Sequence, residues 1–376
     1  GLTHFRISQL FIHMTKLKFG LIGAGGIAQA YAQAFAQSDC CELVGVADVR
    51  LDSAKALAET VSAKAYEDYK LLAEIEPKLD AVIVATPPNL HADLACYFLE
   101  RKFPVLCEKP LCLTVADAIR VTKAAESNGV QFAMASKFRY CDDVIKAKGI
   151  VASGVLGEVL QFENAFTAKV DMSKRWNSNK EISGGGVLID NGTHSVDIVR
   201  YFLGGIDAVL AVDAGGTQDL AVDENVKMFA KTKTGVMASI DLTWGINKEL
   251  PYFISIHGTN GSLHVGWRES KYKLNSNPDW TVFGTGYDKV ASFRGKIENF
   301  SRALRGKDEL LIQPQDALAS VMVIDAAYKS LEQNHWQPVE ERSRSRGGGP
   351  LAIAGMVAVL AAVGPDVAAA LADLSA

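Results

Sequence analysis

Short apolar runs alternate with longer, periodically apolar segments through the first third of the chain. The apolar runs predict strands at residues 18–22, 42–46, 81–85, 105–107 and 131–135. The segments between them predict helices at residues 26–37, 53–61, 90–101 and 116–128. Continuous apolar strands that alternate with helices are typical of a parallel sheet covered by helices on both faces. We therefore predict an α/β domain at residues 16–137.

The pattern changes after residue 138. Apolar and polar positions now alternate, and turn residues separate the segments, which predicts longer strands. These strands are expected at residues 159–166, 208–213, 225–232, 236–242, 252–257 and 261–265, followed by a long helix at 316–333. This alternation indicates an antiparallel sheet with one covered face. We therefore predict a second, α+β domain at residues 138–340.

The two ends of the chain differ from these domains. Residues 1–15 are expected to be an N-terminal extension of the first domain. Met14, near the end of this segment, is expected to be the natural start. Residues 341–376 begin with an Arg-, Ser- and Gly-rich linker and continue as an apolar tail. The tail is either a helical hairpin that packs on a partner subunit or a fused or disordered segment.

Composition narrows the class of protein. The net charge of −4 gives no basic excess, so we expect neither a nucleic-acid partner nor a membrane surface. No apolar run reaches the length of about 18 residues that a membrane helix needs. The six cysteines form no recognisable zinc pattern, so we expect no metal, and free buried thiols favour a reducing, cytoplasmic location.

A glycine-rich turn follows the first predicted strand. The segment GAGGIA at residues 23–28 matches the dinucleotide pattern G-x-G-x-x-A, in which the first glycine permits the tight turn and the second lets the backbone approach a pyrophosphate. The helix that begins there offers unpaired N–H groups. We expect Gly23, Gly25, Gly26 and Ile27 to contact the cofactor.

A carboxylate ends the second predicted strand. Asp48 can accept hydrogen bonds from a ribose diol and repel a 2′-phosphate, which favours NAD over NADP. Arg50 is close enough to hold a 2′-phosphate, so both cofactors stay open. The structural alternative is a plain strand–helix turn with Asp48 as a helix cap.

Polar residues also follow two later strands. Because ligands bind outside the carboxyl ends of parallel strands, Thr86, Asn89 and His91 are expected to touch the cofactor. Glu108 and Lys109 end the next strand and are expected beside the nicotinamide, where the lysine could stabilise a developing alkoxide or relay a proton. The alternatives are an ordinary helical histidine and a surface lysine in a loop.

A second cluster lies beyond the predicted domain boundary. Three glycines at 184–186 precede an apolar helical pattern that carries Asp190 and His194 four residues apart, hence on one face. A carboxylate beside an imidazole would orient it and favour its protonated form, and histidine suits proton transfer from a hydroxyl. Gly192 suggests a close approach by a ring, and Asp197 is expected only to anchor the helix. The alternative is a solvated Asp–His pair.

Together these motifs resemble the glucose–fructose oxidoreductase, inositol dehydrogenase and MocA (Gfo/Idh/MocA) family over residues 16–337. The resemblance is carried by GAGGIA at 23–28, ATPPNLH at 85–91, EKP at 108–110 and GGGVLIDNGTHSVD at 184–197. It implies a Rossmann domain followed by an α+β domain with a large open, mostly antiparallel sheet. It also implies that Lys109, Asp190 and His194 are catalytic, with His194 as acid and base, and that the protein is a homodimer or homotetramer.

Four residues are expected to contact substrate. Lys137 and Arg139, at the crossover into the second domain, could bind a charged group. Trp176 could stack on a sugar ring, and Asn191 could make a polar contact.

The predicted function is NAD(P)-dependent hydride transfer to or from a hydroxyl carbon of a small polyol: a sugar, a sugar derivative or a cyclitol. Two alternatives stay open. The first is a sugar-sensing regulatory protein that binds dinucleotide without turnover. The second is a glycoside hydrolase that uses NAD transiently.

Overall fold

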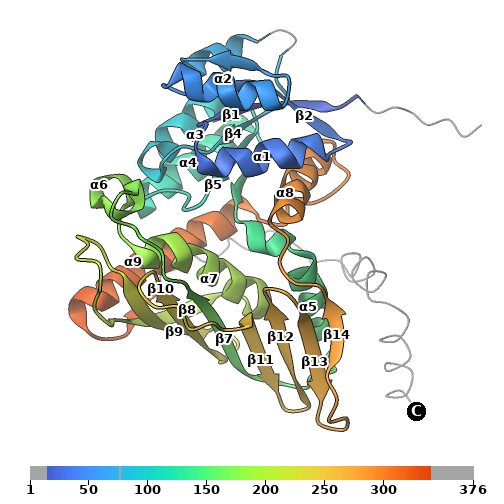
Figure 1. The fold of residues 1–376 in the computed structure, drawn as a ribbon, viewed down its shortest axis with the longest axis vertical. Helices are drawn as coiled ribbons and strands as arrows, with labels where there is room; N and C mark the ends of the chain where they lie inside the picture. Colours follow the sequence, from blue (N-terminus) through green and yellow to red (C-terminus); the bar gives the residue numbers. More distant parts are fainter. Residues whose placement is uncertain (1–14, 76–77, 340–376) are drawn as a thin grey trace, which may run out of the picture.

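The first part of the chain forms a parallel sheet between layers of helices. The computed structural model describes residues 15–75 and 78–339 (Figure 1). The sheet has six strands in the order β3-β2-β1-β4-β5-β6, and every neighbouring pair is parallel. Its elements are β1 (Leu17–Ile22), α1 (Gly26–Ala36), β2 (Cys41–Ala47), α2 (Leu51–Thr60), β3 (Lys64–Tyr66), β4 (Ala81–Val84), α3 (His91–Glu100), β5 (Val105–Glu108), α4 (Val115–Asn128) and β6 (Phe132–Ala135). This is the strand order of a Rossmann fold, in which ligands bind where the order reverses, beside β1 and β4.

The second part forms a larger, mostly antiparallel sheet. Nine strands follow the order β14-β13-β12-β11-β7-β10-β9-β8-β15, and only the pair β7 and β10 is parallel. Its elements are α5 (Asp142–Ala152), β7 (Val159–Thr167), α6 (Lys180–Ser183), α7 (Val187–Leu203), β8 (Ile206–Asp213), β9 (Asn225–Thr232), β10 (Met237–Thr243), β11 (Tyr252–Gly258), β12 (Gly261–Gly266), β13 (Ser270–Leu274), β14 (Thr281–Gly284), α9 (Pro314–Gln333) and β15 (Gln337–Pro338). Helices α5, α7 and α9 share one hydrophobic core with this sheet, and Figure 1 shows them on its inner face. The predicted fold class is confirmed.

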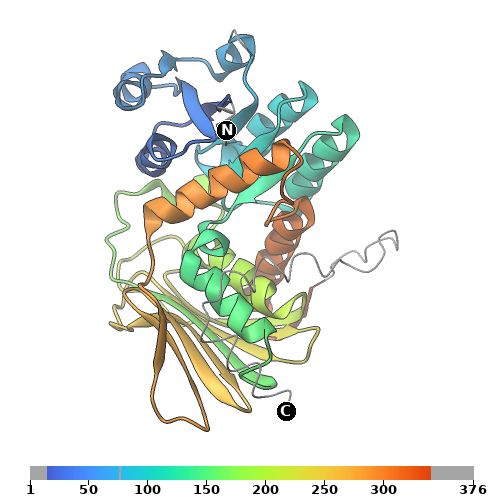
Figure 2. The ribbon, with the colours of Figure 1, turned by 90° about the vertical axis from the view of Figure 1, so that its right-hand side faces the viewer.

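One helix after the second sheet returns to the first domain. Helix α8 (Lys289–Leu304) was not predicted, although its apolar residues have helical spacing. Phe293, Ile297 and Phe300 belong to the same core as Phe19 and Tyr31 of the Rossmann domain. Figure 2 shows α8, in orange, running along that domain. A segment within the sequence range of the second domain can therefore pack in the core of the first. The domain limits given above stay a prediction.

The described residues set limits on other expectations. Residues 1–14, 76–77 and 340–376 lie outside them; these include all but the last residue of the predicted extension and the whole of the predicted linker and apolar tail. Among residues 15–75 and 78–339, no helix has the length and apolar character that a bilayer crossing needs. The six cysteines are free, and all but Cys40 are buried.

Candidate active site

The glycine turn leaves a backbone surface open at the carboxyl end of β1. Gly23 has φ +96°, and a Cβ there would lie 2.6 Å from the carbonyl oxygen of Ala85, so only glycine fits. Gly25 and Gly26 have open space where a side chain would be. Gly25 is the N-cap of α1 and gives it no side-chain cap, so the N–H groups at this helix end are available to an anion.

Asp48 braces the glycine turn. Its Oδ2 accepts a hydrogen bond from the N–H of Ala24 at 2.8 Å, and its Oδ1 accepts one from the N–H of Arg50 at 2.8 Å. The Arg50 Nε lies 3.7 Å from the same Oδ1. A carboxylate has about four acceptor positions, so Asp48 keeps capacity for ribose hydroxyls while it holds the turn. The structural alternative is partly right, because Asp48 does support this turn.

The loop after β4 contains one candidate cofactor contact and one structural residue. The hydroxyl oxygen of Thr86 is buried and has no hydrogen-bond partner among the described residues, whereas Asn89 is exposed. His91 is buried, with Nδ1 2.9 Å from the Pro110 carbonyl oxygen and Nε2 2.8 Å from that of Thr86. Burial lowers the pKa of His91. Both ring nitrogens face backbone carbonyls, so His91 ties two loops together and offers no polar atom to a cofactor.

Glu108 also forms hydrogen bonds within the protein. Its Oε1 accepts hydrogen bonds from Tyr31 Oη and from Lys296 Nζ, both at 2.7 Å, and its Oε2 accepts one from the N–H of Lys109 at 3.1 Å. Burial raises the pKa of Glu108, but the neighbouring Lys296 ammonium outweighs it, so the net pKa is lowered. Glu108 thus fixes the backbone that presents Lys109, and its predicted contact with the cofactor stays a prediction. Its partner Lys296, on α8, was not foreseen.

Lys109 joins the two domains. Its Nζ lies 2.6 Å from Asp190 Oδ1 and donates a second hydrogen bond to the Asp190 carbonyl oxygen at 3.0 Å. Lys109 follows β5 at the carboxyl edge of the Rossmann sheet, and Asp190 lies in the first turn of α7. The contact brings together two motifs that are 81 residues apart.

His194 is buried beside this pair. The residue is 6% exposed, its ring meets the ring of Phe138 edge-on at 5.0 Å between centroids, and its Nδ1 lies 3.3 Å from Ser136 Oγ. Burial lowers the pKa of His194 well below its usual value, and the positive charges of Lys109, Lys137 and Lys296 lower it further. The imidazole is therefore uncharged near neutral pH.

This geometry corrects the predicted Asp–His pair. Asp190 pairs with Lys109 and not with His194, so the expectation that a carboxylate favours the protonated imidazole is wrong. The spacing of four residues puts Asp190 and His194 on one face of the helix, but the Asp190 carboxylate pairs with a lysine of the other domain. Ser136, which faces the ring instead, was missed; its position directly after β6, at the ligand-binding edge, was the available signal.

The start of α7 explains the glycine run. Asp223 caps the helix, because its Oδ1 accepts from the N–H of Gly186 at 2.9 Å and its Oδ2 from that of Leu188 at 2.7 Å. A Cβ at Gly186 would lie 1.8 Å from the Asp223 carbonyl oxygen, and one at Gly185 would lie 1.9 Å from Tyr328 Oη. Small residues are thus required for a close approach by distant segments.

Asp197 anchors α7, as predicted. Its Oδ1 forms an ion pair of 2.7 Å with Nη2 of Arg139, and the two side chains are 0% and 5% exposed. Nη1 of Arg139 lies 3.3 Å from Asp316 Oδ2. Arg139 is therefore committed to the interior, and the expectation that it binds a substrate group is wrong.

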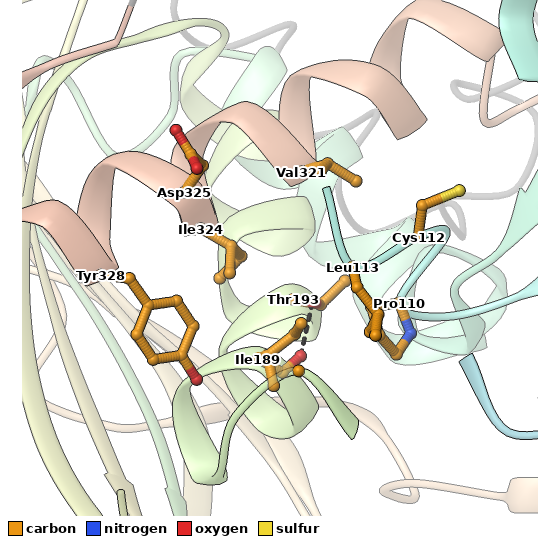
Figure 3. A pocket seen from close by; sticks show the side chains of 10 residues that line it. Pro110, Cys112, Leu113, Ile189, Thr193, Val321, Ile324, Asp325 and Tyr328 are labelled. Carbon is orange, nitrogen blue, oxygen red and sulfur yellow. Dashed lines mark hydrogen bonds between the residues drawn. The ribbon is translucent and has the colours of Figure 1, made fainter. Parts of the chain in front are cut away.

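Ile189 and Thr193 of α7 line a small cavity. The cavity has a volume of about 50 Å³ and is bordered by the loop after β5, α7 and α9 (Figure 3). Thr193, which lines it, donates to the Ile189 carbonyl oxygen at 2.6 Å. A Cβ at Gly192 would meet the side chains of Leu242 at 3.2 Å and Ile324 at 3.4 Å, so apolar packing, not a ring, accounts for this glycine. The lining of the cavity includes neither Asp190 nor His194, so this cavity is not the candidate site.

The three remaining residues with predicted substrate contacts differ in burial and in position. Lys137 is half-buried, with Nζ 5.0 Å from the ring centroid of Phe138. Asn191 is half-buried next to Asp190 on α7, and Trp176 is 43% exposed in the loop before α6. The substrate contacts of Lys137, Asn191 and Trp176 stay predictions.

Comparison with known proteins gives the family. Residues 17–136 match the family model described as "Oxidoreductase family, NAD-binding Rossmann fold", and residues 144–264 match the "GFO/IDH/MocA C-terminal domain". The D-glucoside 3-dehydrogenase of Escherichia coli (strain K12) is 30% identical over 264 residues, which cover 69% of this chain and 71% of that protein. The chain belongs to the Gfo/Idh/MocA oxidoreductase family. It is thus an NAD(P)-dependent oxidoreductase by family.

Two further relatives match a larger share of this chain. D-xylose 1-dehydrogenase (NADP(+)) 2 of Haloferax volcanii is 27% identical over 328 residues, covering 84% of this chain and 98% of that protein. A levoglucosan dehydrogenase solved as a complex with NADH superposes with a TM-score of 0.81 at 22% identity, covering 87% of this chain and 100% of that one. The superposition supports the fold alone.

Proposed function

We propose that this protein transfers a hydride between NAD(P) and a hydroxyl-bearing carbon of a sugar, sugar derivative or cyclitol. The contact of 2.6 Å between Lys109 and Asp190 carries the proposal, because it sets a lysine of the Rossmann edge against the second domain, beside the uncharged His194. Two relatives whose names denote dehydrogenases of a glucoside and of xylose support a polyol substrate.

The described residues fit a dinucleotide. The open backbone at Gly25 and Gly26 suits a pyrophosphate, Asp48 suits a ribose diol, and the unpartnered Thr86 hydroxyl is available for a hydrogen bond. When bound, the nicotinamide supplies the hydride acceptor or donor. Because Asp48 is a carboxylate at the ribose position, we favour NAD over NADP.

Lys109 and His194 have complementary tasks in alcohol oxidation. The Lys109 ammonium binds the reacting oxygen and stabilises the negative charge that develops on it. Asp190 holds the Lys109 Nζ in place. His194 accepts the hydroxyl proton at Nε2, because its Nδ1 faces Ser136 and its ring is uncharged. The substrate loses a hydride from carbon and a proton from oxygen and becomes a carbonyl; reduction reverses both transfers.

A spectrophotometric screen tests the proposal. Purified protein is assayed at 340 nm against a panel of sugars, sugar derivatives and cyclitols with NAD and with NADP. His194→Ala should lower kcat by about 10²–10⁴-fold, the usual contribution of a general base, and leave the dissociation constant of NADH unchanged. The exposed His335→Ala and Lys123→Met serve as matched controls and should retain wild-type rates.

Three outcomes count against the proposal. Dinucleotide binding without turnover on any polyol would indicate a regulatory protein. Glycosidic cleavage without net NADH would indicate a hydrolase. An equal loss of kcat and of NADH affinity in His194→Ala would remove its role as the proton acceptor.

A further inference from the structure

Lys137 is a half-buried cation without an acidic partner. It lies in the 3₁₀ turn Lys137–Tyr140 directly after β6, and no carboxylate among the described residues forms an ion pair with it. The two carboxylates nearest the site are already used, since Asp190 pairs with Lys109 and Glu108 pairs with Lys296. A buried charge without a counter-charge is costly, so the protein pays a penalty here that a ligand could remove.

The surroundings of Lys137 are positive. Burial lowers the pKa of Lys137 to about 8, and the charges of Lys109 and Lys289 act in the same direction. Its Nζ lies over the rings of Phe138, at 5.0 Å, and Tyr287, at 5.1 Å. Such cation–π contacts are worth about 0.5–2 kcal/mol and leave the positive charge in place.

A second donor beside Lys137 also lacks a partner. The hydroxyl of Tyr287 is buried and makes no hydrogen bond to a described residue. Burial raises the pKa of Tyr287, so the phenol stays protonated and can donate. The ring of Trp267, which is 38% exposed, lies 5.9 Å from that of Tyr287. The unsatisfied Tyr287 hydroxyl and the Lys137 ammonium, whose Nζ lies 5.1 Å from the centroid of the Tyr287 ring, can both donate to one anion.

These groups adjoin the reacting end of the site. The charge of Lys137 contributes to the lowered pKa of His194, and the ring of Phe138 contacts both side chains. A ligand held at Lys137 therefore lies next to the proton acceptor.

We infer that the substrate is an anionic sugar, whose carboxylate or phosphate is bound by the Lys137 ammonium and the Tyr287 hydroxyl while its reacting hydroxyl lies at Lys109 and His194. This inference rests on the proposed function and names the substrate class for that site. The anion takes no part in bond making, so the hydride and proton transfers are those given above.

Matched substrates provide the test. Glucose, glucuronate and glucose 6-phosphate differ only in the group at carbon 6, and the same comparison applies to galactose and galacturonate. With wild-type protein, at least one anionic sugar should exceed its neutral counterpart in kcat/KM by about tenfold or more, which corresponds to roughly 1.4 kcal/mol. Whether the carboxylate or the phosphate is preferred identifies the anion, and either preference supports the inference.

Variants then assign the preference to its residues. Lys137→Gln should abolish the preference, because KM for the anionic sugar rises and its kcat/KM falls by a larger factor than kcat/KM for glucose. Tyr287→Phe should change KM in the same direction by less. Lys137→Arg should retain the preference and guards against a folding defect, and Lys123→Gln, on the exposed face of α4, is the control.

Two further measurements test the inference independently of the kinetics of the Lys137→Gln variant. Binding of glucuronate to protein loaded with NADH, where no oxidation takes place, should be measurable by calorimetry and should weaken in Lys137→Gln. Between pH 7 and 9.5, KM for glucuronate should rise as Lys137 loses its proton, while KM for glucose stays level.

The charged groups around Lys137 are compatible with this pH test. They are Glu108 and Lys109 after β5, Lys289 and Lys296 on α8, and His194 on α7. The pKa values of Glu108 and His194 are lowered from values already below 7, so neither titrates in this range. Lys109 binds the reacting hydroxyl, which both substrates carry, so it does not distinguish one substrate from the other.

The outcomes separate the inference from the proposed function. Equal kcat/KM for neutral and anionic sugars would overturn the inference and leave the proposed function intact. A Lys137→Gln variant that loses stability and turns over both substrates equally poorly would also overturn it, since Lys137 would then be structural. Absence of turnover with every polyol would overturn the proposed function itself.

Discussion

Removing one partner of the buried pair of Lys296 and Glu108 should cost several kcal/mol of folding free energy, although the sequence motifs include only Glu108. Lys296 is 0% exposed, and its Nζ lies 2.7 Å from Glu108 Oε1 and 3.6 Å from the ring centroid of Phe293. Lys296→Met keeps the length and apolar stem of the side chain but removes the ammonium. The Glu108 carboxylate then stays buried with only the hydroxyl of Tyr31 and one backbone N–H.

The size of the effect follows from the desolvation of the remaining charge. Removing one partner of a buried ion pair costs about 3–5 kcal/mol, because the other charge is left uncompensated. The double variant Lys296→Met, Glu108→Gln removes both charges and should lose clearly less. An exposed control, Lys55→Met on α2, should stay within about 0.5 kcal/mol of wild type.

Urea denaturation followed by circular dichroism and by fluorescence measures these free energies of unfolding. The pKa of Glu108 is lowered in the folded protein, so its ionised pair stabilises above the unfolded pKa and this contribution disappears as pH falls through the folded pKa. The difference between wild type and Lys296→Met should therefore shrink on acidification. A loss below about 1 kcal/mol, or a double variant no better than the single one, would refute the desolvation argument.

Three further predictions concern the cofactor and the base. Gly23→Ala should weaken NADH binding about tenfold or more by fluorescence titration, because its Cβ would lie 2.6 Å from the Ala85 carbonyl oxygen and its φ is positive; an unchanged dissociation constant would contradict the role of the turn. Asp48→Ser should raise the ratio of kcat/KM for NADP to that for NAD by about tenfold in initial-rate assays, and a constant ratio would exclude Asp48 as the ribose contact. The pH profile of kcat/KM for oxidation should stay level through pH 6.5 and fall only well below it, because the pKa of His194 is lowered. Lys137→Gln removes one cause of that lowering, so the acidic limb should move to higher pH; a wild-type limb at or above 6.5 would count against His194 as the base.

The sequence by itself determined the local structure and the chemical groups of the site. The alternation that predicted a strand at residues 225–232 matches β9 residue for residue, and the glycine turn at Gly23 lies where the pattern placed it. Both are decided within a short segment, by side-chain periodicity and by backbone sterics. Periodicity also placed Asp197 on the same helix face as the candidate site residues, where it was expected to anchor the helix.

Only the tertiary structure decided which groups meet. Spacing on α7 placed Asp190 beside His194, yet the carboxylate pairs with Lys109, because a full positive charge from the other domain is a better partner than a buried, uncharged ring. Glu108 became an interior anchor because α8 returns to the Rossmann core and brings Lys296 with it. Periodicity within a segment tells which side faces inward. It carries no information about what a segment far away in the sequence will place there.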